Sequence, residues 1–502
     1  MTERNNVLLV VLDSVRAENT SLHGYGRETT PFLSDFADRS TVYTQARAPG
    51  IHSIASHVSM FTGTHVEEHG ALHHTAQIDP SRTVWHELET EFGYTTGLFT
   101  NNRIVSDASN LSEAFGYVHE PDYPLTERLE DTVDDTLLER AYYRGYDTVS
   151  RLAAYVRADA DENPDDVESG TPGRLEQAYE GLTSQVGRIA DATGLSELTS
   201  SSGYKTLYGG TFTDAFLEWE SRQDDPWAVC LNLMDAHSPY EPKSEFDRWA
   251  TDRNWQIQRE EKPSVWETLE GRGWDRIESL EPLYDGTIRQ TDEIVRDLVA
   301  NLEDRGLLSE TTLVITSDHG EAFGERSRLN QDIRLRDHKW GIHEVLTHVP
   351  LVVSYPDQTE GTVVDDVVSL TDMPAVLRTA ATDESGTEQL TGEDVALAST
   401  FRLPKGRVSK YSSIDDIDSY VGPWRAVYET RDGSVRKFAA KGEWHVTLDI
   451  DHAGDATVVS REDDGRVAKE YDRLADSGLL TQQTSEIDDE VEQQLEDLGY
   501  IR

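Results

Sequence analysis

The sequence holds a single cysteine, and its first apolar run is short. Cys230 lies in the apolar run WAVCLNL and has no second cysteine to pair with, so intrachain disulfides are excluded and a buried, inert thiol is expected. The run VLLVVL at residues 7–12 is too short to cross a membrane. Neither a positively charged leader nor a small-residue cleavage site precedes it, so we expect a cytoplasmic protein without a membrane span.

Basic residues are scarce, because 46 lysines and arginines stand against 95 acidic residues and give a net charge of −49. Such a chain is unsuited to holding a polyanion, so nucleic acid is excluded as a partner. The acidic residues are spread between ordinary apolar segments, unlike those of a disordered acidic tail. Salt screens the repulsion within such a surface, which favours a salt-adapted, halophilic protein from a high-salt cell.

Short apolar runs alternate with helical patterns along the 502 residues, which indicates a large α/β domain with a smaller appendage. Runs of this kind are typical of buried, mostly parallel strands joined by crossover helices. They lie at residues 7–12, 94–99, 227–233, 312–316 and 350–355. The clearest helix is predicted at 285–304, where apolar residues recur at three- and four-residue steps.

Two stretches depart from this rhythm. Residues from about 120 to 210 are rich in Tyr and Asp and predict a helical insertion, which would cover the site as a lid. After about residue 400, short alternating pieces separated by DG and KG turns predict an antiparallel sheet. We therefore expect a main α/β domain over 1–400 and a C-terminal subdomain over 401–502.

Polar residues directly follow three of the predicted strands, and open α/β sheets bind ligands at such strand ends. These residues are Asp13 with Ser14, residues 235–238 (DAHS) and residues 317–320 (SDHG). An aspartate after a strand is as often the N-cap of the next helix, so for Asp13 alone both interpretations stay open. Together, carboxylate oxygens and imidazole describe a divalent-cation site if the strand ends are neighbours.

Ser53 opens a short amphipathic stretch inside PGIHSIASHVSMFTG, residues 49–63. Taken by itself, the residue is best interpreted as a helix N-cap. The other interpretation is chemical: a hydroxyl at a helix N-terminus that touches a metal becomes a nucleophile for a tetrahedral ester centre.

Several segments together resemble the sulfatase family of the alkaline phosphatase superfamily. They run in the family's order and cover most of the chain apart from the insertion. The segments are NVLLVVLDSVRAENTSLHGYGRETTPFLSDFA, ASHVSMFTGTHVEEHG, LNLMDAHSPYEP, YDGTIRQTDEIVRDLVANLEDRGLLSETTLVITSDHGEAFGE, HVPLVV and QQLEDLGYI. The resemblance implies an alkaline-phosphatase-like α/β/α sandwich with a large mixed, mostly parallel sheet. Residues 1–400 would be its catalytic domain and 401–502 a small α+β subdomain with an antiparallel sheet.

The resemblance also implies a metal site and a nucleophile. It makes Asp13, Asp318 and His319 ligands of one divalent metal ion, which Ser53 touches as the nucleophile. Ser53 stands at the cysteine or serine of the family's C/S-x-P-S-R signature, because ASHVSMFTG aligns with P-S-R-x-S-L-x-T-G. His57 then replaces the signature arginine in the catalytic centre.

Further residues are placed around the ester by the same resemblance. His237, in the family's M-D-x-H-x-P-Y segment, contacts the ester oxygens or protonates the leaving group. Lys339 stands where the family often has a lysine that neutralises sulfate, and His338 beside it is expected to bind the substrate or a second metal. The remaining histidines singled out, which are expected to pack locally, are His65, His69, His343 and His348.

The chain departs from the family pattern around the nucleophile. Formylglycine formation needs the signature proline and arginine, and Ala55 and His57 stand in their places. We therefore expect Ser53 to act as an unmodified hydroxyl. The family's Asp-Asn pair is Asp318 with His319 here, which resembles the phosphonate and phosphate monoesterases of the superfamily.

These observations predict a metal-dependent sulfatase-like hydrolase that cleaves sulfate monoesters through a serine nucleophile. One alternative is a phosphoesterase or phosphotransferase acting on phosphorylated lipid head groups or sugars. Another is an inactive sulfatase-like protein that binds glycans. The expected partner is a small-molecule or glycan sulfate or phosphate ester. The expected metal is Ca²⁺, Mg²⁺ or Mn²⁺, while the His319 imidazole also favours Zn²⁺.

Overall fold

The structure is a computed structural model of the chain, and the described residues are 4–119, 208–382, 390, 395–401, 417–431, 434–451, 456–482 and 484. The predicted insertion at about 120–210 lies outside them except for residues 208–210. The segment QQLEDLGYI also lies outside them. Within the described ranges, no helix is both long enough and apolar enough to cross a lipid bilayer.

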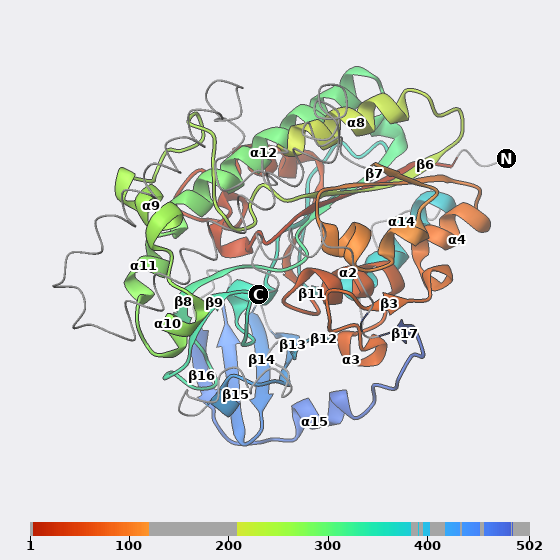
Figure 1. Cartoon of the computed structure of the whole chain (residues 1–502). Coiled ribbons are helices and arrows are strands. Elements are labelled where there is room, and N and C mark those ends of the chain that lie inside the picture. The colour runs from red at the N-terminus through yellow and green to blue at the C-terminus, as the bar shows by residue number, and fades with distance from the viewer. Residues whose placement is uncertain are drawn as a thin grey trace, which may run out of the picture. The chain divides into compact units, whose positions relative to one another are not determined.

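One large sheet forms the centre of the main part of the chain (Figure 1). Its strands are β1 Asn6–Leu12, β2 Thr41–Arg47, β4 Thr95–Thr100, β5 Tyr117–His119, β6 Trp227–Leu233, β7 Thr311–Thr316, β10 Leu351–Ser354 and β11 Thr362–Ser369. They lie in the order β11-β2-β10-β7-β1-β6-β4-β5. Only the two pairings made by β10 are antiparallel. The prediction of a mixed, mostly parallel sheet is confirmed.

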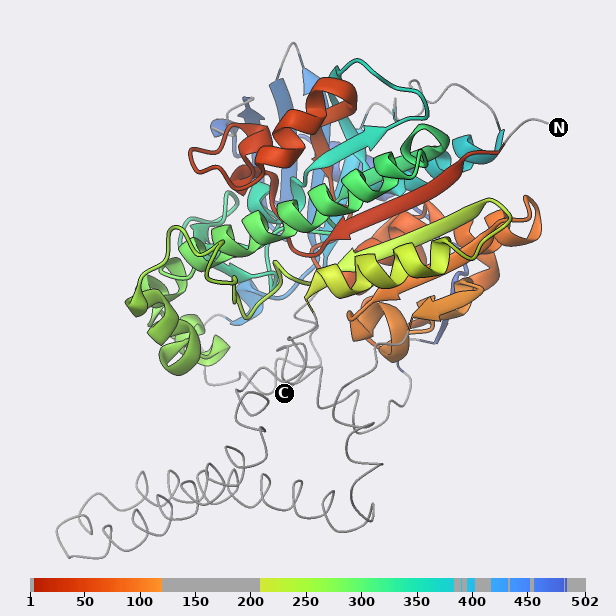
Figure 2. The ribbon, with the colours of Figure 1, turned by 90° about the horizontal axis from the view of Figure 1, so that it is seen from above.

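Helices cover both faces of this sheet. On one face lie α1 Pro31–Phe36, α8 Gly209–Glu220 and α12 Glu281–Asp304, with α12 running along the sheet in Figure 2. On the other lie α2 Ser53–Thr62, α4 Val84–Thr90 and α14 Met373–Thr382. Helix α12 begins four residues before the predicted start, because Pro282 fits the first helical turn, where its missing N–H costs no hydrogen bond.

The strands are apolar on both faces because both faces are covered. In β1, Val7, Leu9 and Val11 pack into the core beneath α2, α4 and α14, while Leu8 and Val10 are equally buried on the other face. Cys230 is buried in β6, and burial raises the pKa of its thiol, as expected for an inert cysteine.

Shorter helices and two-stranded ribbons lie outside the large sheet and its main helices. The helices are α3 Val66–His69, α9 Asp252–Gln256, α10 Val265–Leu269, α11 Trp274–Glu278, α13 Glu344–Thr347 and α15 Arg466–Tyr471, with a π-helical turn at Ile257–Glu261. Two small ribbons pair β3 Gln77–Ile78 with β17 Leu480–Gln482, and β8 Ala322–Arg326 with β9 Arg334–Asp337.

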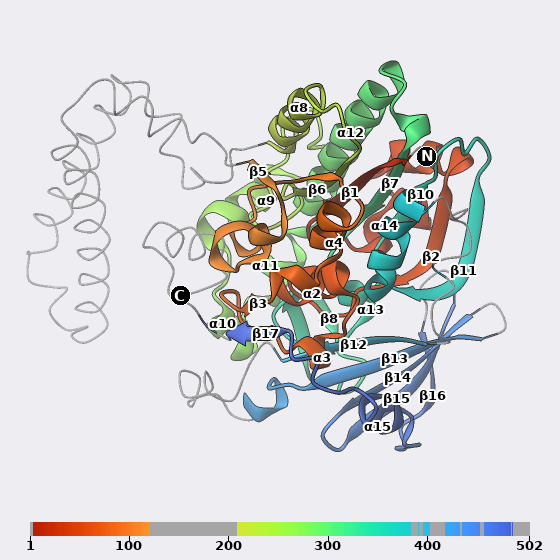
Figure 3. The same ribbon diagram turned by 90° about the vertical axis from the view of Figure 1, so that its right-hand side faces the viewer.

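A second, five-stranded sheet follows towards the C-terminus (Figure 3). Its strands, antiparallel throughout, are β12 Val395–Thr400, β13 Trp424–Arg431, β14 Ser434–Lys441, β15 Trp444–Ile450 and β16 Ala456–Ser460. The predicted antiparallel sheet is confirmed, and its first strand lies just before residue 401. The fully buried Lys437 joins it to α13, since Nζ donates to Glu344 Oε1 at 2.6 Å and to the Ile342 carbonyl at 2.8 Å.

Candidate active site

The ends of β1 and β7 bring two aspartates together. The two strands are parallel neighbours, with Val11 beside Thr316. Asp13 follows the first strand and Asp318 the second. The Ser14 amide donates to Asp318 Oδ1 at 3.2 Å, so the two turns are joined directly. The expected meeting of these strand ends is therefore present.

Asp13, Asp318 and His319 form what we call the ligand cluster. Each offers one donor atom, these atoms lie within 4.8 Å of one another, and all three side chains are buried. The His319 Nδ1–H donates to the Gly320 carbonyl at 2.9 Å. Because a carbonyl only accepts, Nε2 is left as the basic nitrogen, and it lies 3.4 Å from Asp318 Oδ2. The imidazole therefore turns its lone pair towards the carboxylates.

The electrostatics of the ligand cluster fit a cation. Burial, with the Asp318 carboxylate as the second cause, raises the pKa of Asp13 to about 7. Burial likewise raises the pKa of Asp318 to about 7, against hydrogen bonds that include one from Ser53. A cation among these atoms reverses such shifts because it stabilises both carboxylates. Carboxylate oxygens with one imidazole nitrogen suit a divalent ion.

Ser53 lies at the first position of α2 and is fully buried beside the ligand cluster. The N-cap position belongs to His52, whose side chain makes no capping bond, so the N-cap interpretation of Ser53 is wrong. The hydroxyl instead accepts from Asn102 Nδ2 at 3.3 Å and is hydrogen-bonded to the Asp318 carboxylate of the cluster. The helix N-terminus adds a partial positive charge that stabilises a deprotonated hydroxyl.

His57 lies one turn further along α2. Its Nδ1–H donates to the Ser53 carbonyl at 2.9 Å, and Nδ1 lies 3.7 Å from Asp318 Oδ2. Burial lowers the pKa of His57 to about 4, so the imidazole is neutral near pH 7. A neutral ring thus occupies the place where the family signature has a permanent cation.

Two asparagines that sequence reasoning missed hold the Asp13 carboxylate. Asn102 Nδ2 donates to Asp13 Oδ2 at 2.8 Å as well as to Ser53, and Asn232 Nδ2 approaches the same oxygen at 3.4 Å. Asn102 follows strand β4, so the strand-end rule applied to residues 94–99 would have found it. Asn232 lies inside β6 and carries no signal of that kind.

A group of basic side chains lies next to the ligand cluster, and we call it the basic wall: His237, Lys262, His338 and Lys339. The His338 ring lies between two others, with its centroid 4.5 Å from that of His319 and 5.4 Å from that of His237. Its Nδ1 lies 3.4 Å from Glu321 Oε1. Lys339 is half-buried and acts electrostatically on Glu321.

All the residues singled out for the chemistry therefore gather in one region. They are Asp13, Ser53, His57, His237, Asp318, His319, His338 and Lys339. Asp235 does not join them, because its carboxylate accepts from the Gly209 amide and from Gln290 Nε2, which ties α8 to α12.

Four histidines pack locally, as expected. His65 caps α3 and His343 caps α13 through their side chains. His69 Nε2 lies 3.1 Å from Ser59 Oγ, and His348 Nε2 donates to the Thr44 carbonyl at 2.8 Å.

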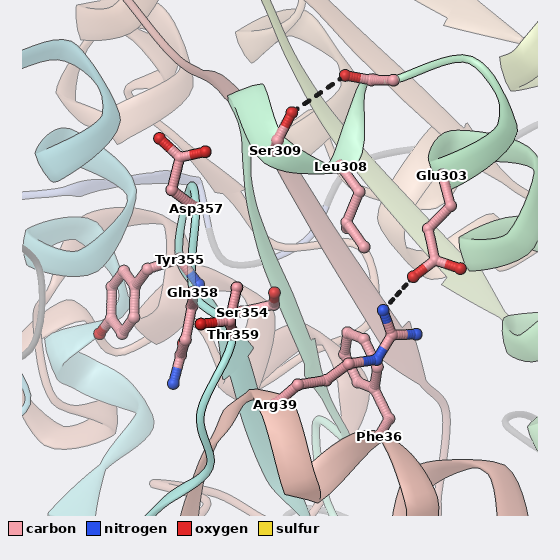
Figure 4. A pocket seen from close by; sticks show the side chains of 11 residues that line it. Phe36, Arg39, Glu303, Leu308, Ser309, Ser354, Tyr355, Asp357, Gln358 and Thr359 are labelled. Carbon is pink, nitrogen blue, oxygen red and sulfur yellow. Dashed lines mark hydrogen bonds and ion pairs between the residues drawn. The ribbon is translucent and has the colours of Figure 1, made fainter.

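A separate cavity of about 280 Å³ lies at the opposite end of the sheet (Figure 4). Leu308 and Ser309, just before β7, line it together with Ser354 at the end of the antiparallel β10. Arg39 forms an ion pair with Glu303 in its wall. Ligands of such sheets bind at the carboxyl ends of the parallel strands, so the ligand cluster and not this cavity is the candidate active site.

Comparison with solved structures supports the fold. The phosphonate monoester hydrolase of Agrobacterium radiobacter has 15% sequence identity and a TM-score of 0.59, covering 95% of this chain and 97% of that chain. BT4656, solved in complex with its substrate D-glucosamine-2-N,6-O-disulfate, has 12% identity and a TM-score of 0.56, covering 99% of this chain and 98% of that chain. The predicted fold class is confirmed.

Sequence comparison leads to the family. Arylsulfatase K of Gallus gallus is 22% identical over 380 residues, 74% of this chain and 62% of that protein. Arylsulfatase K of Xenopus laevis is 30% identical over 105 residues, 21% of this chain and 18% of that protein. The chain thus matches less than two thirds of the length of these relatives. The family profile described as Sulfatase matches residues 5–382, more than half of the chain, and the chain therefore belongs to the sulfatase family.

Proposed function

We propose that the chain is a metal-dependent hydrolase of sulfate monoesters in which Ser53 is the nucleophile. The observation that carries this proposal is the position of the Ser53 hydroxyl, buried beside the ligand cluster and bonded to the same asparagine that holds Asp13. Residues 1–400 would form the catalytic domain, and residues 401–502 would form the C-terminal subdomain. We propose the cytoplasm of a high-salt cell as its setting, on the support of the net charge of −49.

Asp13, Asp318 and His319 would hold the ion, which we propose to be Ca²⁺, Mg²⁺ or Mn²⁺. When bound, a divalent ion lowers the pKa of a hydroxyl that it touches and withdraws charge from ester oxygens. Ser53, with its proton released to water, attacks the sulfur in line through Oγ as the bond between sulfur and the alcohol oxygen breaks, and the Asn102 amide bonds to that Oγ. No formylglycine is involved in this proposal, because Ala55 and His57 replace the residues that its formation requires.

Three members of the basic wall, His237, His338 and Lys339, act on the ester. Lys339 compensates charge on the equatorial oxygens, and His338 adds a hydrogen-bonding contact to the substrate. His237 protonates the departing alcohol, for which its Nε2 is the suitable atom because its Nδ1–H donates to the Ser238 carbonyl at 2.7 Å. Water then hydrolyses the Ser53 ester and restores the free hydroxyl.

A phosphoesterase or phosphotransferase is the second candidate, and the missing formylglycine signature favours it. Ala55 and His57 replace the signature proline and arginine, so the nucleophile is an unmodified serine. Such an enzyme would act on phosphorylated lipid head groups or sugars and use the same Ser53 and ligand cluster.

The test is a paired assay at high salt with 4-nitrophenyl sulfate and 4-nitrophenyl phosphate, for the purified protein and its Ser53→Ala variant. We expect sulfate turnover that Ser53→Ala lowers by roughly 1000-fold or more. Ser56→Ala, which removes a buried hydroxyl three residues further along α2, is the matched control and keeps its activity. Phosphate turnover alone would overturn the sulfatase proposal.

Two further results have a clear meaning. Unchanged activity of Ser53→Ala would show that another group is the nucleophile. Absence of turnover of either ester by the unaltered protein, loaded with each candidate metal in turn, would instead favour an inactive protein that binds sulfated or phosphorylated glycans.

A further inference from the structure

Lys262 reaches the candidate active site from the later part of the connection that also holds His237. It follows the π-helical turn Ile257–Glu261, in the connection between β6 and α12. Its ammonium donates to Ser238 Oγ at 2.5 Å and lies 5.6 Å from the centroid of the Tyr240 ring. The side chain is partly exposed, so a bound molecule can reach its charge.

The ammonium of Lys262 lies beside the residue that the proposed function assigns to the leaving alcohol. The His237 imidazole and the Lys262 ammonium both bond to Ser238, the first to its carbonyl at 2.7 Å and the second to its hydroxyl at 2.5 Å. His237 is the residue that protonates the alcohol in the proposed function. In the proposed function, the Lys262 ammonium is therefore assigned to the alcohol half of the ester.

Lys262 belongs to a cluster of cations. Lys262 and Lys339 both act on the buried Glu321 and on Asp337, and Arg336 Nε donates to Asp337 Oδ2 at 3.1 Å. Although burial works the other way, these cations hold the pKa of Asp337 well below its usual range. Three cations of the described residues thus act on these two carboxylates. In a chain with 95 acidic and 46 basic residues, such a gathering of cations favours an anionic ligand.

We propose that Lys262 binds a second anionic group on the alcohol half of the substrate, so that the preferred ester carries a carboxylate, sulfate or phosphate beside the reacting group. This inference rests on the proposed function, since it takes Lys339 for the reacting group and His237 for the leaving alcohol. Lys262 is then a specificity-determining residue. Its removal weakens binding of substrates with two anionic groups and leaves those with one almost unaffected.

The experiment measures binding and not turnover, with anions that contain no ester and so are not consumed. The holoenzyme is titrated calorimetrically at high salt with benzenesulfonate, which has one anionic group, and with 3- and 4-sulfobenzoate, which have two. We expect at least one sulfobenzoate to bind about tenfold more tightly than benzenesulfonate. In Lys262→Gln this preference falls below about twofold, while the affinity for benzenesulfonate changes by less than about threefold.

Two matched variants separate charge from structure. Lys262→Arg keeps the cation and most of the preference. Lys243→Gln removes an exposed lysine of the same connection, whose ammonium lies 3.1 Å from the Tyr208 ring centroid, and keeps the preference of the parent. Circular dichroism verifies that each variant is folded.

Several results would overturn the inference. These are equal binding of all the anions by the parent, a preference that survives Lys262→Gln, or an equal loss of affinity for every anion. Phenylphosphonate, which has two charges on one group, is the last arm. If Lys262→Gln lowers the affinity for phenylphosphonate as much as it lowers the affinity for the sulfobenzoates, Lys262 contacts the reacting group instead. A parent without ester hydrolysis refutes the proposed function separately, because the binding preference is measured without turnover.

Discussion

The ligand cluster and the basic wall lie side by side but are built differently. The ligand cluster stands on two neighbouring strands, β1 and β7, and its three side chains are all fully buried. The basic wall comes from two connections, because His237 and Lys262 lie at separate places between β6 and α12, whereas His338 and Lys339 follow β9. Both of its lysines are partly exposed.

This difference separates two tasks. The sheet register fixes the ligand cluster, so a change there disturbs the chemistry common to every substrate. Side chains on connections can be exchanged without altering the sheet, so we expect substrate choice to be set in the wall, at Lys262, beside the groups that act on every ester. Four predictions test the separation, beginning with the largest expected effect.

Asp318→Asn tests the ligand cluster. The substitution removes one negative charge among the donor atoms, so we expect loss of the bound metal and a fall in kcat of roughly 1000-fold. Metal content after dialysis is measured by mass spectrometry, and kcat with the best aryl ester.

Asp292→Asn is the control for that variant. Asp292 is equally buried and its pKa is likewise raised by burial to about 7, but it accepts from the Phe32 and Leu33 amides at the start of α1, outside the ligand cluster. The Asp292→Asn variant should keep its metal even if its free energy of unfolding falls. Full metal content in Asp318→Asn would refute the ligand cluster.

Lys339→Ala tests the basic wall. Losing this cation should lower kcat/KM by roughly 100-fold, since one donor to a developing oxyanion contributes on that scale. The metal content should stay that of the parent, in contrast to Asp318→Asn. Lys469→Ala, an exposed lysine on α15, serves as the control. Loss of metal in Lys339→Ala would contradict the separation of the two parts.

The same difference explains what the sequence could predict. Asp13 and Asp318 follow apolar runs whose strand character is readable, and parallel neighbours put such ends together. Lys262 follows no strand and belongs to no motif, and its approach to Ser238 depends on the path of the whole connection from 241 to 280. A single sequence contains no local signal for such a path, so the strand-end rule and the family resemblance predicted His237, His338 and Lys339 but not Lys262.

Ser53 shows a limit of local reasoning. A serine at the start of an amphipathic stretch has a strong tendency to cap the helix, and that tendency favoured the wrong role. Asn102, which comes from the end of β4, and the carboxylate of Asp318 surround the hydroxyl. Both partners lie far along the chain from Ser53, so the tertiary contacts and not the local pattern decide its position.

The pH dependence of stability tests the ligand cluster without any substrate. The pKa of Asp13 and that of Asp318 are raised to about 7 from 3.8, so the folded, metal-free protein prefers both groups protonated. Their contribution to the free energy of unfolding is fully present below about pH 4 and is lost as the pH rises through about 7. A bound cation removes this loss because it stabilises the ionised forms.

Thermal unfolding measures this effect. Added metal should raise the Tm by several degrees at pH 8 and by much less at pH 5. In Asp318→Asn the gain at pH 8 should disappear, whereas in Asp292→Asn it should remain. An equal gain at both pH values would mean that the ion binds elsewhere.

Salt should have the smallest effect, and it should act through the approach of the substrate. A chain of net charge −49 repels anionic esters, and raising the salt from 0.1 to 1 M shortens the screening length from about 10 to about 3 Å. We expect kcat/KM to rise by roughly two- to tenfold over that range, mostly through KM, with the folded state verified by circular dichroism. The lysines of the basic wall would contact a bound anion directly, with no salt between them. Their contribution to substrate binding should therefore persist at high salt. A salt effect that vanished in Lys339→Ala would instead place the repulsion at the site itself and not over the whole surface.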